Sequence, residues 1–174
     1  MDKATLITQI AKAFPASPLP QVSLRQAVLA DQTLTKSISD TEWETERLKD
    51  GHIAWPSLSD ETLIECGLGL AHLDEQSFVY YIAAFLRFAV KHIDASLLSP
   101  EGELLGTVVF SVTHTSNYNL ARLKHLNDAQ IDCVIEFLRL VQERSKTHGA
   151  DASKALVRYW QTPEARRKTV VYVP

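Results

Sequence analysis

The stretch "LDEQSFVYYIAAFLRFAVKH", residues 73–92, contains the densest apolar run of the chain. Twelve of the thirteen residues from Phe78 to Val90 are apolar or aromatic. A membrane span needs about 20 such residues, and this shorter run has charged residues on both sides. A helix that is apolar nearly all round but too short to span a membrane is typical of a core helix that other helices surround. The stretch therefore predicts a central helix over residues 74–93, with Asp74 as its N-cap.

Helical patterns continue on both sides of this stretch. The first fourteen residues place Leu6, Ile10 and Phe14 on one side of a helix. Their apolar residues are not continuous enough for a signal peptide. Ser39 and Glu42 have the spacing of a capping box, so a helix that carries Trp43 is expected to begin there. Further helices are predicted after Ser59 or Asp60, after Asn127, and over residues 152–160.

Two runs have the composition of β-strands. Residues 104–113, "LLGTVVFSVT", are short and rich in β-branched side chains, and "TVVYV" follows at residues 169–173. The sequence leaves open whether they pair as a minor two-stranded element, because an isolated pair of strands is marginally stable in water. An exposed VVYV edge could alternatively join two copies of the chain. The expected fold class is mainly α: a single-domain helical bundle around a central apolar helix. Whether a minor two-stranded β element is also present is left open.

Size and charge restrict the function classes. The 174 residues suit one domain over residues 1–174, and 45% of them are hydrophobic. A formal net charge of −3 gives no electrostatic reason to expect a nucleic-acid partner. Cys66 and Cys133 form no motif and are interpreted as small buried hydrophobic residues. The expected protein is cytoplasmic and does not bind membranes, and its oligomeric state is left open.

Catalytic and cofactor motifs are absent from the sequence. There is no Gly-x-Ser-x-Gly elbow and no phosphate-binding loop, and the six histidines show no metal-ligand spacing. No catalytic residue and no cofactor is therefore assigned. The alternative is a metal site near His114, His125 and Asp128, which requires the fold to bring the three together.

Trp43 lies in the charged segment "TEWETERLKD", residues 41–50, where helical spacing supplies few apolar neighbours. An exposed tryptophan among charged residues is a candidate interface anchor. The competing interpretation is that the indole packs back onto the core. On the first interpretation, Trp43, Glu44 and Glu46 are candidate partner-binding residues.

Several segments together resemble a family of small uncharacterised bacterial proteins with a domain of unknown function. The likeness covers residues 23–160, and its most distinctive parts are residues 73–86 and 126–140, the latter with Asp128-Ala129-Gln130. Members of the family carry Leu-Pro-Ala after the tyrosine pair, where this chain has Ile82-Ala83-Ala84. The resemblance implies a bacterial protein whose central helix lacks a proline kink, and it implies no activity.

Two functions follow as hypotheses. The first is a non-enzymatic protein-binding or accessory protein of bacteria, such as an immunity-type inhibitor of a toxin, with an unidentified protein partner. The missing catalytic motifs, the mild acidity and Trp43 favour it. The alternative is an enzyme of unrecognised type, dependent on a metal at His114, His125 and Asp128.

Overall fold

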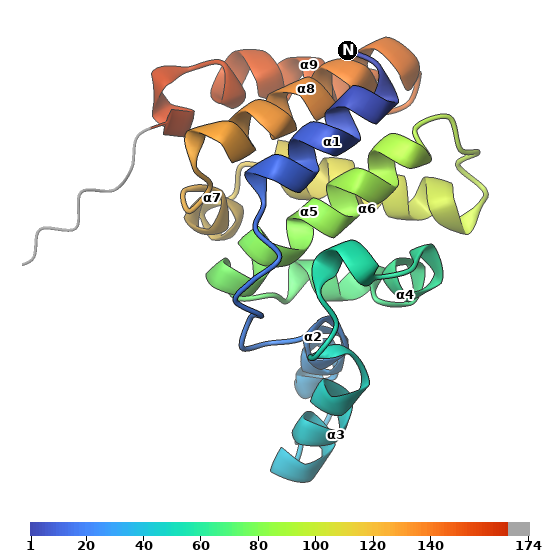
Figure 1. The fold of residues 1–174 in the computed structure, drawn as a ribbon, viewed down its shortest axis with the longest axis vertical. Helices are drawn as coiled ribbons and strands as arrows, with labels where there is room; N and C mark the ends of the chain where they lie inside the picture. Colours follow the sequence, from blue (N-terminus) through green and yellow to red (C-terminus); the bar gives the residue numbers. More distant parts are fainter. Residues whose placement is uncertain (167–174) are drawn as a thin grey trace, which may run out of the picture.

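The computed structural model describes residues 1–166, and every regular element in that range is helical (Figure 1). The α-helices are α1 (Lys3–Ala13), α2 (Leu24–Asp31), α3 (Asp40–Asp50), α4 (Asp60–Glu65), α5 (Glu75–Lys91), α6 (Pro100–Thr113), α7 (Asn117–Leu123), α8 (Asp128–Arg144) and α9 (Gly149–Ala155). Short turns of tighter or wider helix include η1 (Gln32–Leu34), η2 (Trp55–Ser57), η3 (Gly67–Ala71), η4 (Leu156–Trp160) and η5 (Pro163–Arg166). The prediction of a mainly α protein is confirmed.

Helix α5 is the most buried helix of the described chain. Twelve of its seventeen residues are buried, and it contacts α1, α4, α6, α7 and α8. Its first turn is capped by Asp74, whose carboxylate accepts the Ser77 backbone N–H at 3.0 Å. Arg87, the one charged residue within the apolar run, donates to the Leu58 carbonyl at 2.7 Å. Figure 1 shows α5 and α6 crossing the middle of the molecule, with α8 and α9 on one side and α2 and α3 on the other.

The predicted strand over residues 104–113 is wrong, because this segment belongs to α6. Ser99 caps the helix by accepting the Gly102 N–H at 3.2 Å. The buried side chains of the segment follow a helical spacing: Leu104, Leu105, Val108, Val109 and Val112. Burying this face against the core outweighs the β preference of the individual valines, which is a weak local term. The second run, residues 169–173, lies outside the described residues.

The helix predicted to begin after Ser59 or Asp60 is broken in two. Ser59 caps α4 as expected, but α4 ends at Glu65 and the tighter turn η3 continues the chain. At Gly69 a Cβ atom would lie 3.0 Å from the Leu24 carbonyl oxygen, so any larger residue would push η3 away from α2. Gly69 therefore permits the close packing of η3 against α2.

The two ends of the described chain pack on the same core. Leu6, Ile10 and Phe14 of the α1 segment are buried, as their spacing predicts. Near the other end, the Trp160 indole N–H donates to the Val112 carbonyl at 2.7 Å and ties η4 to α6. Both cysteines are free and buried, which confirms that interpretation. Among the described helices, none combines the length and apolar character that crossing a bilayer requires.

Candidate functional site

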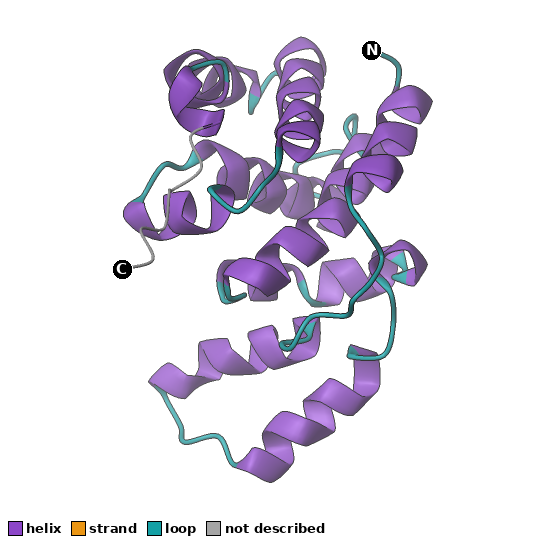
Figure 2. Cartoon of the chain, turned by 60° about the vertical axis from the view of Figure 1, so that its left-hand side comes forward, coloured by secondary structure: helices purple, strands orange, loops and turns teal. Residues whose placement is uncertain are grey.

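Helices α2 and α3 and the loop between them, residues 24–50, form an arm at one end of the molecule (Figures 1 and 2). We refer to these residues as the α2–α3 arm. Helix α3 begins as predicted: the Ser39 hydroxyl accepts the Glu42 N–H at 3.2 Å, and the Glu42 carboxylate accepts the Ser39 N–H at 2.9 Å. Acidic residues in its first turn and basic residues in its last turn complement the helix dipole. The helix is therefore well specified by local sequence.

Packing of α3 onto the rest of the protein is unusual because it involves hardly any apolar burial. Its one buried residue is a carboxylate, Asp50, which is 2% exposed. By contrast, α2 buries Leu24, Ala27 and Leu29. Helix α2 is the main packing partner of α3. The hydrophobic effect, which holds α5 and α8 in place, thus contributes little to the position of α3.

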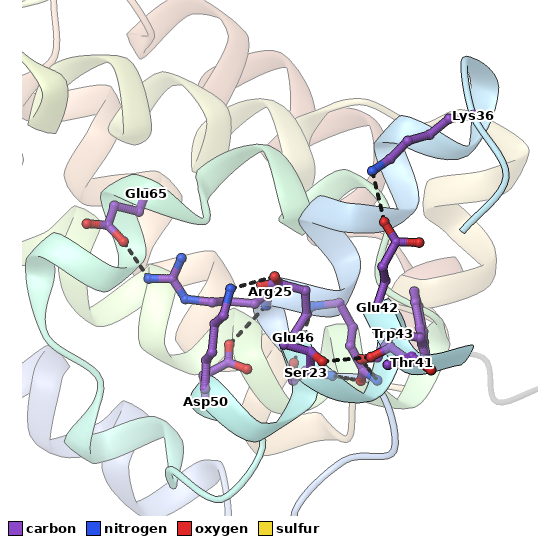
Figure 3. A network of polar contacts seen from close by, with 12 residues as sticks. Ser23, Arg25, Lys36, Thr41, Glu42, Trp43, Glu46, Asp50 and Glu65 are labelled. Atoms are coloured by element: carbon purple, nitrogen blue, oxygen red, sulfur yellow. Dashed lines mark hydrogen bonds and ion pairs between the residues drawn. The ribbon is translucent and has the colours of Figure 1, made fainter. Parts of the chain in front are cut away.

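Hydrogen bonds hold α3 in its place (Figure 3). Asp50 accepts the Arg25 backbone N–H at 2.9 Å, and the Gln26 side chain donates to the Trp43 carbonyl at 3.1 Å. The Arg47 guanidinium donates to the Pro20 carbonyl at 3.3 Å and to the Gln21 carbonyl. The same arginine also contacts the Gln26 side chain at 3.4 Å. Both ends of α3 are thereby tied to α2 and to the proline-rich segment before it.

A shallow depression of about 270 Å³ lies at the base of the arm. Its lining residues are Arg25, Val28, Leu29, Gln32, Glu46, Lys49, Glu65 and Cys66. The charged groups in it are paired: Arg25 with Glu65 and Lys49 with Glu46, each at 2.5 Å. The hydrogen bond to Glu65 raises the pKa of Arg25. Burial raises the pKa of Cys66 to about 11, so the thiol is protonated at neutral pH and is a poor nucleophile.

The outer surface of α3 is acidic. The helix has a formal charge of −3, and a formal charge of −2 remains when the buried Asp50 is left out. Glu44 is exposed on this surface, whereas Glu46 has a side chain only 25% exposed and is paired with Lys49. Trp43 is half-buried and lies outside the set of apolar residues that pack on the main core. Of the three residues predicted to bind a partner, Glu44 is therefore the most accessible.

Leu48 is a residue of this surface that the sequence analysis missed. It is 76% exposed, which makes it one of the most exposed large apolar side chains of the described chain. Trp43 and Leu48 are five residues apart, which places them about 140° apart around a helix. This spacing could have revealed Leu48 from the sequence. Trp43 and Leu48 cannot face α2 at the same time, so one of them must face solvent.

The three residues of the metal alternative have different nearest partners. His114 stacks on Phe110 with 4.7 Å between ring centroids, and the His125 Nε2 atom lies 2.6 Å from the Glu75 carboxylate. Asp128 lies 3.5 Å from the Arg166 guanidinium. Within residues 1–166, no group of three or more His, Cys, Asp or Glu side chains is arranged to hold a metal ion. The fold does not bring His114, His125 and Asp128 together as one ligand set.

The way α3 is held leads to a prediction about its local stability. Since hydrogen bonds at a partly exposed surface hold α3, its amides should exchange with solvent through openings that cost at least about 3 kcal/mol less than those of α5. Native-state hydrogen exchange, read by mass spectrometry or NMR, measures both free energies in one sample. Equal protection of α3 and α5 would show that the arm opens only when the whole domain unfolds.

Comparison with known proteins places this fold in a family. Neither curated proteins nor solved structures gave a match. Residues 2–164 match the model of a family of unknown function, DUF6714, and the match extends beyond residues 23–160 at both ends. It includes all of α1 and the first half of η5, so nearly the whole described chain is the shared unit. The expected likeness to a domain of unknown function is confirmed: the chain belongs to the family of unknown function DUF6714.

Proposed function

We propose that this protein is a non-enzymatic binding protein of the bacterial cytoplasm that holds a partner protein against the outer face of its α2–α3 arm. The partner has a basic surface, and covering that surface inhibits it, as an immunity protein inhibits its toxin. One observation carries the proposal. Helix α3 has a formal charge of −3 and buries no apolar side chain, yet two capping and tethering networks keep it ordered.

A binding role for the exposed face of α3 would explain why the protein contains this helix. An 11-residue helix that buries no apolar residue gains little from packing, so it adds little to the stability of the domain. Its outer face offers a leucine beside a glutamate, which suits a contact with an apolar centre and a charged rim. Acidic residues around that contact would speed association with a basic partner and make binding sensitive to salt.

The test compares two double variants of the full chain. The arm variant carries Glu44→Arg and Leu48→Asp. The matched control carries the same two kinds of change, Glu143→Arg and Leu98→Asp, at exposed residues of α8 and of the loop before α6. Each tagged protein is used to capture its partner from the host extract, and the dissociation constant is then measured with the purified partner.

We expect the wild type and the control to retain one protein in equal molar amount and the arm variant to lose it. With the purified partner, the arm variant should bind at least about 100-fold more weakly, because it loses an apolar contact and reverses a charge. Wild-type affinity should fall as salt is raised from low to physiological concentration. A third variant, Trp43→Ala, separates the contribution of the half-buried indole.

Three results would contradict the proposal. The first is an arm variant that binds the partner as tightly as the wild type does. The second is a partner whose binding is insensitive to salt. The third is a protein that captures nothing from the extract under conditions where it is folded, judged by circular dichroism.

A further inference from the structure

A pocket with no charged side chain in its lining lies beneath the proline-rich segment between α1 and α2. We call residues 14–21 the strap and this cavity the strap pocket. It is open to solvent and has a volume of about 360 Å³. Its lining comes from the strap, α5 and α8: Phe14, Pro15, Ser17, Pro18, Leu19, Pro20, Gln21, Gln76, Val79, Tyr80 and Gln130. A volume of this size lies at the small end of the range for ligand sites in proteins.

Hydrogen bonds from two directions hold the wall of the strap pocket. The Tyr80 hydroxyl donates to the Ala16 carbonyl at 2.9 Å and accepts the Trp55 backbone N–H at 3.2 Å. On the other side, Arg47 of α3 donates to the Pro20 and Gln21 carbonyls. Three prolines fix φ along the strap, which lowers the entropy that binding would cost. The pocket is therefore largely formed before any ligand enters.

The polar groups of the pocket are neutral, and one of them has an N–H donor without a partner among the described residues. Gln130 is 4% exposed, and its Oε1 atom accepts the Asn127 N–H at 2.9 Å in the capping box of α8. Its Nε2 group has no partner in residues 1–166 and is not completely enclosed. Gln130 is one of the residues that line the pocket, so its side-chain amide is within reach of a molecule bound there. The ring of Tyr80 and the side chains of Phe14 and Val79 supply the apolar surface around it.

We propose that the strap pocket binds a small neutral molecule that is mostly apolar and carries one hydrogen-bond acceptor oxygen. The apolar part lies against Phe14, Val79 and the Tyr80 ring, and the oxygen accepts the Gln130 amide. A charged ligand is disfavoured because it would lose hydration without meeting an opposite charge among the lining residues. This site is separate from the outer face of the α2–α3 arm, although Arg47 joins the strap to α3 and so links the two.

The test uses three probes of similar size on the isotope-labelled full chain. Acetophenone is neutral and has one acceptor oxygen, α-methylstyrene has the same shape without the acceptor, and benzoate carries a charge. Amide chemical shifts are followed at matched probe concentrations. Acetophenone should shift the signals of the strap and of residues near Val79 and Gln130. We expect acetophenone to bind about tenfold more tightly than α-methylstyrene. Benzoate should bind more weakly than either neutral probe.

Two variants and one control locate the contact. Gln130→Glu keeps an oxygen that accepts the Asn127 N–H, so the helix stays capped, but it removes the N–H donor. Acetophenone affinity should fall about tenfold in this variant. Gln9→Glu makes the same change on α1, outside the pocket, and should leave the affinity unchanged. Val79→Phe fills the pocket and should abolish binding of both neutral probes.

Equal affinity for the three probes, or shifts that lie away from the strap, would overturn the proposal. So would an acetophenone affinity that Gln130→Glu leaves unchanged. The same titration on a chain that ends at Arg166 tests whether residues 167–174 occupy the pocket instead. If acetophenone binds only to that shortened chain, the pocket is filled by the chain's own residues 167–174, and the proposal of a small-molecule site is wrong.

Discussion

Replacing Phe85 by alanine is expected to lower the free energy of unfolding by about 3–5 kcal/mol. Phe85 is fully buried in α5, the helix that contacts α1, α4, α6, α7 and α8. Its truncation removes a large apolar surface and leaves a cavity that the surrounding helices cannot close without moving. Domains of this kind are stable by about 5–15 kcal/mol in total, so the variant should unfold at a much lower urea concentration.

Phe110→Ala is the matched control, because it makes the same chemical change at a side chain that is 60% exposed. It should cost less than about 1 kcal/mol, since the ring is mostly exposed and stacks on His114 at the surface. Urea unfolding of both variants, followed by circular dichroism, gives the two free energies. Similar losses in the two variants would mean that the interior around α5 is less tightly packed than its burial indicates.

Replacing Arg122 by alanine should cost about 3 kcal/mol, through loss of a buried cation rather than of apolar surface. Arg122 of α7 is 3% exposed, and its guanidinium donates to the Leu70 carbonyl at 2.9 Å and to Asn119. The cation lies 4.3 Å from the centre of the Phe78 ring and 4.5 Å from that of Tyr118. Burial lowers the pKa of Arg122 from its usual value.

The size of this effect follows from what the alanine variant leaves behind. The Leu70 carbonyl at the end of η3 loses its guanidinium donor, and two aromatic rings lose a cation. Arg122→Lys keeps the charge but cannot reproduce the planar arrangement of donors, so we expect an intermediate loss. Arg139→Ala, at an exposed residue paired with Glu136, should cost less than about 0.5 kcal/mol. Wild-type stability in the lysine variant would show that the charge alone is sufficient.

Local sequence determined where most of the helices begin. The capping box at Ser39 and the cap at Asp74 form as predicted, and helices begin after Asn127 and after Ser59, one of the two caps considered for α4. Each cap depends on side chains within three residues of the helix start. The buried face of α1 also follows from the spacing of its apolar residues. These features depend on residues only a few positions apart in the chain, so they can be predicted from a short segment of sequence.

Part of the candidate site could be predicted in the same way. The acidic helix that carries Glu44 can be predicted from the sequence, because its segment is rich in charged residues and supplies Trp43 with few apolar neighbours. Which face of α3 points outward was not predictable, since it depends on Asp50, Gln26 and Arg25 forming hydrogen bonds across 17 to 25 residues of chain. The exposure of Leu48 follows from that orientation.

The sequence by itself determined the mainly helical class, the starts of α3, α4, α5 and α8, and the acidic character of α3, because these depend on neighbouring residues. Only the tertiary structure decided that residues 104–113 form a helix, that Arg122 is buried between aromatic rings, and that the strap closes over α5 to form a pocket. Each of these depends on which surfaces meet in space. Contacts between distant segments can outweigh a local preference of a fraction of a kcal/mol per residue.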